Sequence, residues 1–275
     1  MESQSAAAPA APAAAPYMRD RFGCCFHNWI AQQHRDLNEL LVAVSTDSGD
    51  AEKLRSLAGK NIQHFRDYLE VRSQLAQHDA PSFFCPSWCT SFEDSFLWIG
   101  GCSDFKRSLS RRPTLAIRLV YSISGSDLEA WLTSGGRRGD DNSNGSGDNL
   151  SAISASQLKS INELHMKTAR MEEKLSSRMA SMQEEIADDP LALIARRRGR
   201  VGEESESVER VMKGHALSLA RVLTEADEMR LATLREMVEE ILTPLQAVEF
   251  LVNMKKLHLS IHEWGKRRDS VLGKV

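Results

Sequence analysis

The sequence predicts an all-α protein, a helical bundle of long amphipathic helices with short connecting helices. Apolar residues recur three and four positions apart through long stretches of both halves of the chain, as on one face of a helix. The chain has eight prolines, three of them within the first 16 residues, which leaves long segments free to be helical. No segment shows a convincing strand pattern, so a bundle of helices is the layer architecture that fits.

The chain of 275 residues divides into a tail, one helical domain and a short end. Residues 1–18 are rich in alanine and proline and offer little apolar surface to bury, so we expect a disordered N-terminus. We expect the helical domain over residues 19–268 and a C-terminal tail over 269–275. Residues 134–150 are rich in glycine, aspartate and asparagine, which predicts a flexible linker within the domain.

The N-terminal half begins with two long helices. Spacings of three and four predict a first helix over about 22–44, which ends near the turn Thr46–Asp50. A second amphipathic stretch predicts a helix from about 51 to 77, packed antiparallel to the first.

Shorter elements follow the first two helices. Residues 79–90 contain two prolines and are predicted to form a loop. Residues 91–99 are predicted to form a short helix that Gly100 and Gly101 stop. Pro113 suits the first turn of another helix, and Ser126–Glu129 has the capping-box pattern of a brief helical turn.

The C-terminal half is predicted to consist of long helices. Apolar positions indicate one helix over about 158–186 and another over about 208–241, separated by a charged break at 196–206. Thr243, Pro244 and Gln246 supply an N-cap, an N1 proline and the N3 partner of a capping box. They begin a last helix that we expect to end near Gly265.

Composition and motifs argue against several functional classes. The sequence contains no Gly-rich phosphate loop, no G-x-S-x-G elbow and no H-E-x-x-H motif. Its paired carboxylates have the spacing of a solvated helix face. These observations predict a protein that is not an enzyme. The net charge of -3 gives no overall positive field, so direct binding to nucleic acid is not expected.

Cysteine usage and hydropathy bear on location. Five cysteines are an odd number, and no signal peptide is recognisable, which favours a reducing compartment with free thiols. No apolar run is long enough to span a membrane. We expect the protein in the nucleus and cytosol, and the basic cluster at 196–200 suits a localisation signal or a phosphate contact.

Two histidines of the last helix, His258 and His262, are four residues apart and share one face. They fit three interpretations: interfacial histidines beside Trp264, a Zn²⁺ or Cu²⁺ pair, or haem ligation. Spacing alone favours the first. Axial ligands lie on opposite sides of a porphyrin, so one straight helix supplies at most one ligand to a given iron. His165 and His215, on the apolar stripes of other helices, are candidates for a second ligand.

Several motifs resemble a known plant family. Residues 93–102, Glu-Asp-Ser-Phe-Leu-Trp-Ile-Gly-Gly-Cys, resemble the signature of the Delay of Germination (seed dormancy control) domain, which also forms the C-terminal part of TGA-type basic-zipper transcription factors. Residues 255–265 and 161–165 resemble the Delay of Germination proteins rather than the TGA factors. The likeness extends over about residues 20–268.

This resemblance implies a regulator of seed dormancy and abscisic-acid signalling that acts through protein–protein contacts. It implies non-covalent b-type haem bound through His258 and His262. It also implies that the chain restrains type 2C protein phosphatases through an N-terminal segment that contains Phe26 and Trp29. The TGA likeness implies an alternative, a transcriptional cofactor that contacts basic-zipper proteins. No basic-zipper region precedes the domain here, so direct DNA binding is not implied.

The chain departs from the family pattern in two places. The family's docking segment has Asp-Ser-Tyr before its tryptophan, whereas this chain has Cys24, Cys25 and Phe26 before Trp29. The acid and both hydroxyls are absent, so we expect any phosphatase contact here to be hydrophobic. Residues 103–111 are an insertion between the Gly-Gly-Cys and Arg-Pro motifs.

Overall fold

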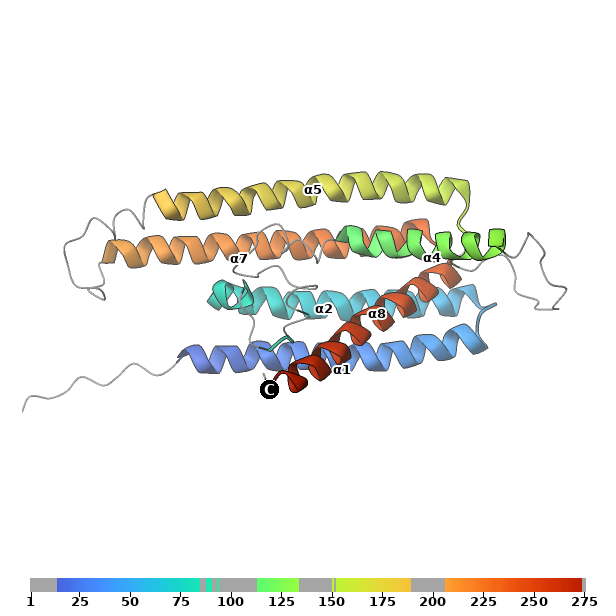
Figure 1. Cartoon of the computed structure of the whole chain (residues 1–275), viewed down its shortest axis with the longest axis horizontal. Coiled ribbons are helices and arrows are strands. Elements are labelled where there is room, and N and C mark those ends of the chain that lie inside the picture. The colour runs from blue at the N-terminus through green and yellow to red at the C-terminus, as the bar shows by residue number, and fades with distance from the viewer. Residues whose placement is uncertain are drawn as a thin grey trace, which may run out of the picture.

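The computed structural model describes residues 14–84, 88–90, 93, 113–133, 150, 152–188 and 206–273, and these residues form helices and turns without a strand (Figure 1). The all-α prediction is confirmed. In chain order the elements are α1 (Ala14–Thr46), α2 (Ala51–Phe84), α4 (Pro113–Thr133), α5 (Ala155–Asp188), α7 (Glu206–Arg235), the π-helix η2 (Glu236–Ile241) and α8 (Pro244–Val271).

The long helices lie side by side in the order α1, α2, α7 and α5, and α8 crosses over α1 and α2 (Figure 1). The main hydrophobic core draws buried side chains from most of the helices, among them Leu40, Leu54, Ile117, Ile161 and Phe250. No helix among the described residues is long and apolar enough to cross a membrane.

The first helix begins earlier than predicted. Helix α1 starts at Ala14, inside the segment 1–18 that we expected to be a disordered tail. Pro16 lies in its first turn, where backbone N–H groups have no partner within the helix, so proline is tolerated there. The other end agrees with the sequence, because α1 stops at Thr46 and α2 begins at Ala51.

Helix α2 continues into the predicted loop at 79–90. It reaches Phe84 across a kink at Asp79, where φ is -153° and ψ is 70°. The Asp79 carboxylate accepts a hydrogen bond from the Ser82 backbone N–H at 3.4 Å, and Pro81 falls in the first turn of the new helical piece. The two features that suggested a loop therefore restart the helix, and the loop prediction is wrong for residues 80–84.

The C-terminal half agrees more closely with the prediction. Helices α5 and α7 correspond to the two expected long helices. Helix α7 continues into the π-helix η2, which the spacing did not predict. Thr243 and Gln246 form the predicted capping box at the start of α8. In the other half, α4 runs without interruption through the predicted turn at 126–129.

Several predicted features lie outside the described residues: the short helix 91–99 apart from Glu93, the Gly100–Gly101 stop, the linker before Leu150 and the break at 196–205. Leu150 itself is buried, and its N–H donates to the Glu249 Oε2 at 2.6 Å. The last residue of the predicted linker is therefore fixed to α8.

The last helix does not end at Gly265, and residues 269–271 of the predicted C-terminal tail are helical. A Cβ atom on Gly265 would overlap the Thr90 hydroxyl and lie 2.8 Å from the Thr90 Cβ. Glycine is present because the segment around Thr90 lies directly against α8, rather than because the helix stops.

Replacing Gly265 with alanine should therefore destabilise the domain, although alanine is the better helix former. We expect Gly265→Ala to lower the free energy of unfolding by about 1–3 kcal/mol, the usual cost of overpacking. The matched control is Gly59→Ala in α2, because nothing lies within 4 Å of its added Cβ. That variant should gain about 0.5–1 kcal/mol. Urea unfolding measures both, and equal effects of the two changes would contradict the close contact.

Candidate functional site

The two histidines singled out by the sequence both lie on α8, where the helix packs against α1. His262 is buried with 5% of its surface exposed, whereas His258 is half-buried. Four residues of α-helix separate them, so they share one side of the helix. The structure thus confirms the shared face, and it gives the two rings different surroundings.

Glu93 holds the His262 ring from a separate segment of the chain. Thr90 and Glu93 form a capping box: the Thr90 N–H donates to Glu93 Oε2 at 3.0 Å, and the Glu93 N–H donates to Thr90 Oγ1 at 3.1 Å. The second carboxylate oxygen, Oε1, lies 2.8 Å from His262 Nδ1. Both side chains are buried, and Glu93 is 0% exposed.

The charge state of Glu93 fixes the roles of the two ring nitrogens. Burial raises the pKa of the Glu93 carboxyl, but the hydrogen bonds from His262 and Thr90 outweigh it, so the pKa lies below its ordinary value. An ionised carboxylate only accepts hydrogen bonds, so His262 Nδ1 carries the hydrogen and donates it. The other ring nitrogen, Nε2, is left as the atom that could bind a metal.

Apolar side chains of α1 enclose this pair. The Phe26 ring lies edge-on to the His262 ring with their centroids 5.9 Å apart. Phe26 forms a small buried cluster with Ile30 and with Leu259 of α8. Together with the contact between Thr90 and Gly265, this cluster shields the hydrogen bond between Glu93 and His262 from water, which strengthens it.

A second buried polar group joins α8 to α1 two turns before His262. The Lys255 Nζ donates to Gln33 Oε1 and to Asp36 Oδ2, each at 3.0 Å. Asp36 Oδ1 lies 2.9 Å from the Nδ1 atom of His64 on α2. Burial raises the pKa of Asp36, but the charge of Lys255 and the hydrogen bonds from Gln32 and Lys255 outweigh burial. The pKa of Asp36 therefore lies below its ordinary value, and the carboxyl stays ionised. Burial lowers the pKa of Lys255, and Asp36 opposes that effect.

The two aromatic residues expected to contact a phosphatase have internal partners. Phe26 is 2% exposed and belongs to the cluster around His262. Trp29 is half-buried and stacks on Tyr68 of α2, with ring centroids 4.6 Å apart and 9° between the planes. The Lys255 Nζ lies 5.8 Å from the centre of the Trp29 ring. Phe26 therefore has almost no surface to offer a partner, whereas Trp29 keeps part of its own.

The two histidines considered as second haem ligands, His165 and His215, lie in another part of the bundle. The ring centroids of His165 and of Tyr121 in α4 lie 5.8 Å apart. His215 lies near Glu185 of α5, whose charge partly offsets the lowering of the His215 pKa by burial. Both belong to the α4–α5–α7 part of the bundle rather than to the α1–α8 contact. Within the described residues, no group of three or more His, Cys, Asp or Glu side chains could hold a metal ion.

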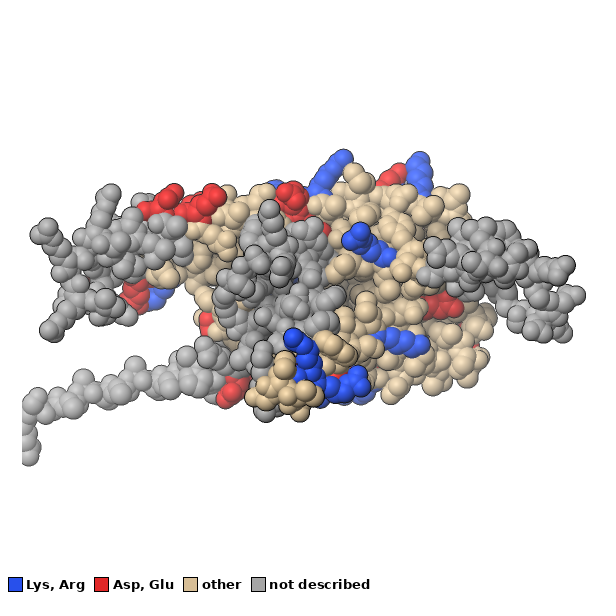
Figure 2. Space-filling view, in the orientation of Figure 1, with Lys and Arg blue, Asp and Glu red and all other residues tan. Residues whose placement is uncertain are grey.

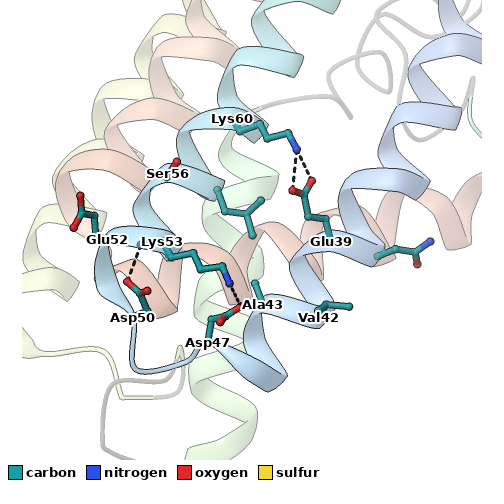
Figure 3. Close-up of a pocket in the computed structure, with 11 residues that line it drawn as sticks. Glu39, Val42, Ala43, Asp47, Asp50, Glu52, Lys53, Ser56 and Lys60 are labelled. Atoms are coloured by element: carbon teal, nitrogen blue, oxygen red, sulfur yellow. Dashed lines mark hydrogen bonds and ion pairs between the residues drawn. The ribbon is translucent and has the colours of Figure 1, made fainter.

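A groove of about 900 Å³ lies at the turn between α1 and α2, and its charged side chains pair with one another (Figure 3). Lys60 bridges to Glu39 and Lys53 bridges to Asp47, each at 2.7 Å. Asp50 accepts from the Lys53 backbone N–H at 3.0 Å. These pairs fasten the two helices at their turn, so we assign the groove a structural role.

Sequence reasoning missed Glu93, Asp36 and Lys255 as members of the site. The Thr-x-x-Glu pattern of residues 90–93 is the signal from which this capping box could have been predicted. Lys255 occupies an inward position of α8, four residues before Leu259, where an apolar side chain would be usual. A charged residue at such a position signals a buried partner, but the sequence does not say which one.

The bond between Glu93 and His262 should make stability depend on pH. The folded pKa of Glu93 is depressed, so its contribution is present at neutral pH and is lost as pH falls through that pKa. We expect Glu93→Gln to cost about 1.5–3 kcal/mol near neutral pH, the range for hydrogen bonds to charged groups. Because the variant no longer titrates there, its stability should fall less than that of wild type on acidification.

Urea unfolding at several pH values from about 7 down to about 2 measures this difference, since the loss begins near the ordinary pKa of glutamate and is complete only below the depressed pKa of the folded state. Glu263→Gln is the control, because Glu263 is an exposed residue of α8. Parallel pH profiles for wild type and Glu93→Gln would contradict an ionised Glu93 that is hydrogen-bonded in the fold.

Known proteins are similar to this chain both in one family domain and over most of its length. Residues 36–122 match the family profile described as "Seed dormancy control". The Arabidopsis thaliana protein DOG1-like 1 is 38% identical over 259 residues, which is 89% of this chain and 89% of the relative. DOG1-like 3 from the same plant is 36% identical over 247 residues, which is 89% of this chain and 84% of the relative.

A weaker likeness reaches the transcription factor TGA6 of Arabidopsis thaliana, which is 25% identical over 246 residues. That alignment covers 87% of this chain but 59% of the factor. The stronger matches run through almost the whole chain and agree with the motif resemblance. The chain therefore belongs to the DOG1, or seed dormancy control, family of plant proteins.

Proposed function

We propose that this protein is a haem-binding regulator of seed dormancy and abscisic-acid signalling that acts by contacting other proteins, with His262 as the haem ligand. The observation that carries the haem proposal is the buried hydrogen bond from His262 Nδ1 to Glu93. Histidines that bind metals commonly donate their other ring N–H to a carboxylate, which fixes the ring and makes the ligating nitrogen more basic.

The donor chemistry of His262 fits an axial haem ligand. Its Nδ1 is engaged by Glu93, so Nε2 is the ligating atom. His258 lies on the same side of the helix, so it does not reach the opposite face of the same porphyrin; it would contact a propionate or act as an exchangeable ligand. A bound haem supplies an iron whose axial coordination can be made and broken as conditions change.

Access to His262 depends on the packing around it. The ring is 5% exposed and lies against Phe26, so a ligand reaches Nε2 only if the contacts of this cluster open. Apparent affinity then falls by the fraction of molecules in the open form. Haem binding is thereby linked to the contact between α1 and α8. A change in the coordination of the iron would alter the packing of α1 against α8.

We further propose that type 2C protein phosphatases contact the exposed side of α1. Cys24, His27 and Asn28 are exposed there, beside the half-buried Trp29. The relative named RESPONSE TO ABA AND SALT 1 supports the link to abscisic acid, with 28% identity over 249 residues, 87% of this chain and 93% of that protein. The family's acidic docking residue is absent, so this contact would depend on apolar area.

The alternative function is a transcriptional cofactor of TGA type. The likeness to TGA6 favours it, because the matched part of that factor corresponds to nearly all of this chain. In that role the chain would act in the nucleus, as well as in the cytosol, by contacting basic-zipper proteins without reading DNA itself.

Titration with hemin tests the haem proposal. We expect wild type to give a saturable shift of the Soret band, His262→Ala to lose it, and Glu93→Gln to bind about tenfold to a hundredfold more weakly, the usual effect of removing a ligand's carboxylate partner. His34→Ala is the control, because His34 is an exposed histidine of α1. Far-ultraviolet circular dichroism confirms that each variant is folded, and undiminished binding by folded His262→Ala would remove His262 as the ligand.

Capture by immobilised protein separates the two partner classes. If α1 docks a phosphatase, Asn28→Arg should weaken capture of a type 2C phosphatase at least about tenfold, as expected when a charge is placed in an apolar contact. Met166→Arg on the exposed side of α5 should leave it unchanged. Capture of basic-zipper proteins without phosphatases would favour the cofactor role instead.

A further inference from the structure

We propose that the outward face of α8 is a docking surface for an acidic amphipathic helix of a partner protein. Four apolar residues define this surface, which we call the outer seam: Leu257, Ile261, Trp264 and Val271. Leu257 is 50% exposed, Trp264 is 45% exposed and Val271 is 85% exposed. Large apolar side chains in a row on a helix surface mark an interaction site when they are contiguous.

The spacing of the outer seam is that of a coiled-coil contact. Leu257, Ile261 and Trp264 are four and then three residues apart, and Val271 follows one heptad after Trp264. Arg268 occupies the remaining position of this pattern. Positions that repeat every 3.5 residues form the apolar line on which a second helix lies. From Leu257 to Val271 this line is about 21 Å long at 1.5 Å per residue, which is enough for two heptads of a partner.

The opposite face of α8 holds the helix in place. Lys255, Leu259 and His262 are buried against α1, and Gly265 lies against Thr90. The outer seam is therefore the second face of a helix whose first face is already packed. It is presented in fixed form, so a partner would not have to order it on binding.

The charge around the outer seam defines the chemistry of its occupant. Arg268 lies within the line of the seam, and Lys256 and Arg267 are exposed along one flank of it, where Glu263 is the exposed acid. Lys266 is exposed on the side of α8 that faces away from the seam. Glu263 lies 3.7 Å from Lys266, and the Arg268 guanidinium lies 5.9 Å from the centre of the Trp264 ring. Lys and Arg side chains gather where the C-terminal end of α8 meets solvent (Figure 2).

This excess of positive charge selects between possible occupants. A helix with acidic residues at the positions flanking its apolar line would pair with Lys256, Arg267 and Arg268. A second copy of this chain would place basic residues against basic residues in a symmetric contact, which is unfavourable. An anionic membrane would attract the same basic side chains, but binding to a membrane does not require apolar residues at heptad spacing. The acidic helix is the occupant that both features favour.

The test uses the full chain and a fluorescently labelled synthetic peptide of three heptads, with leucine at positions a and d and glutamate at e and g. Repulsion between the glutamates keeps this peptide from pairing with itself at neutral pH. A matched peptide with lysine at e and g is the first control. We expect the acidic peptide to bind at least about tenfold more tightly than the basic one, with an affinity that falls as salt increases.

Variants of exposed residues assign the binding to the outer seam. Leu257→Ala combined with Trp264→Ala should weaken binding of the acidic peptide at least about tenfold, since buried aromatic anchors carry most of such contacts. Leu158→Ala combined with Met166→Ala, at exposed apolar sites of α5, should leave it unchanged. Lys256→Glu combined with Arg267→Glu should shift the preference toward the basic peptide.

Three results would overturn the proposal. The two peptides could bind equally or not at all. Phosphatidylserine vesicles could capture the protein through Trp264 while the acidic peptide does not, which would make the seam a membrane contact. Analytical ultracentrifugation could show self-association that Trp264→Ala abolishes, which would make the occupant a second copy of the chain.

Discussion

Helix α8 buries polar side chains on its inward face, and the need to pair them fixes how the helix lies on α1. Lys255 meets Asp36 and His262 meets Glu93, with two helical turns between the two contacts. Leaving a buried charge without its partner costs about 3–5 kcal/mol. Asp36 lies on α1 and Glu93 lies on a segment after α2, so a shift of α8 would separate both pairs at once. The position of α8 is therefore set by charge as well as by apolar packing.

The same constraint gives α8 two roles on two faces. Its inward face holds His262 in one orientation through Glu93 and against Phe26, while its outward face presents Leu257 and Trp264 to solvent. A ligand at His262 would compete with the packing between α1 and α8. Partner contacts proposed for α1 and for the outer seam lie on the two helices that this packing joins.

Periodicity was sufficient to predict the long helices, and the Thr243–Gln246 cap to predict the start of α8, because both are local properties of the chain. Prediction from the sequence failed in two ways: at Gly265 a distant contact decided the outcome, and at Asp79 and Pro81 the same local residues fit either a loop or a helix start. Gly265 suggests a helix end, but Thr90 requires its missing side chain; Asp79 and Pro81 suggest a loop, but they begin a new helical piece. His262 was found from its spacing and family likeness, whereas Glu93 became its partner only through tertiary packing.

The proposed haem site depends on one hydrogen bond, in which Glu93 accepts the Nδ1–H of His262 and leaves Nε2 as the atom for the iron. Nitrogen-15 NMR of the histidine rings measures this tautomer directly, through two-bond correlations between ring nitrogens and ring hydrogens. We expect the hydrogen of His262 to lie on Nδ1 in the wild-type protein, and this preference to be lost in Glu93→Gln. A hydrogen fixed on Nε2 in the wild-type protein, with Nδ1 accepting, would contradict it.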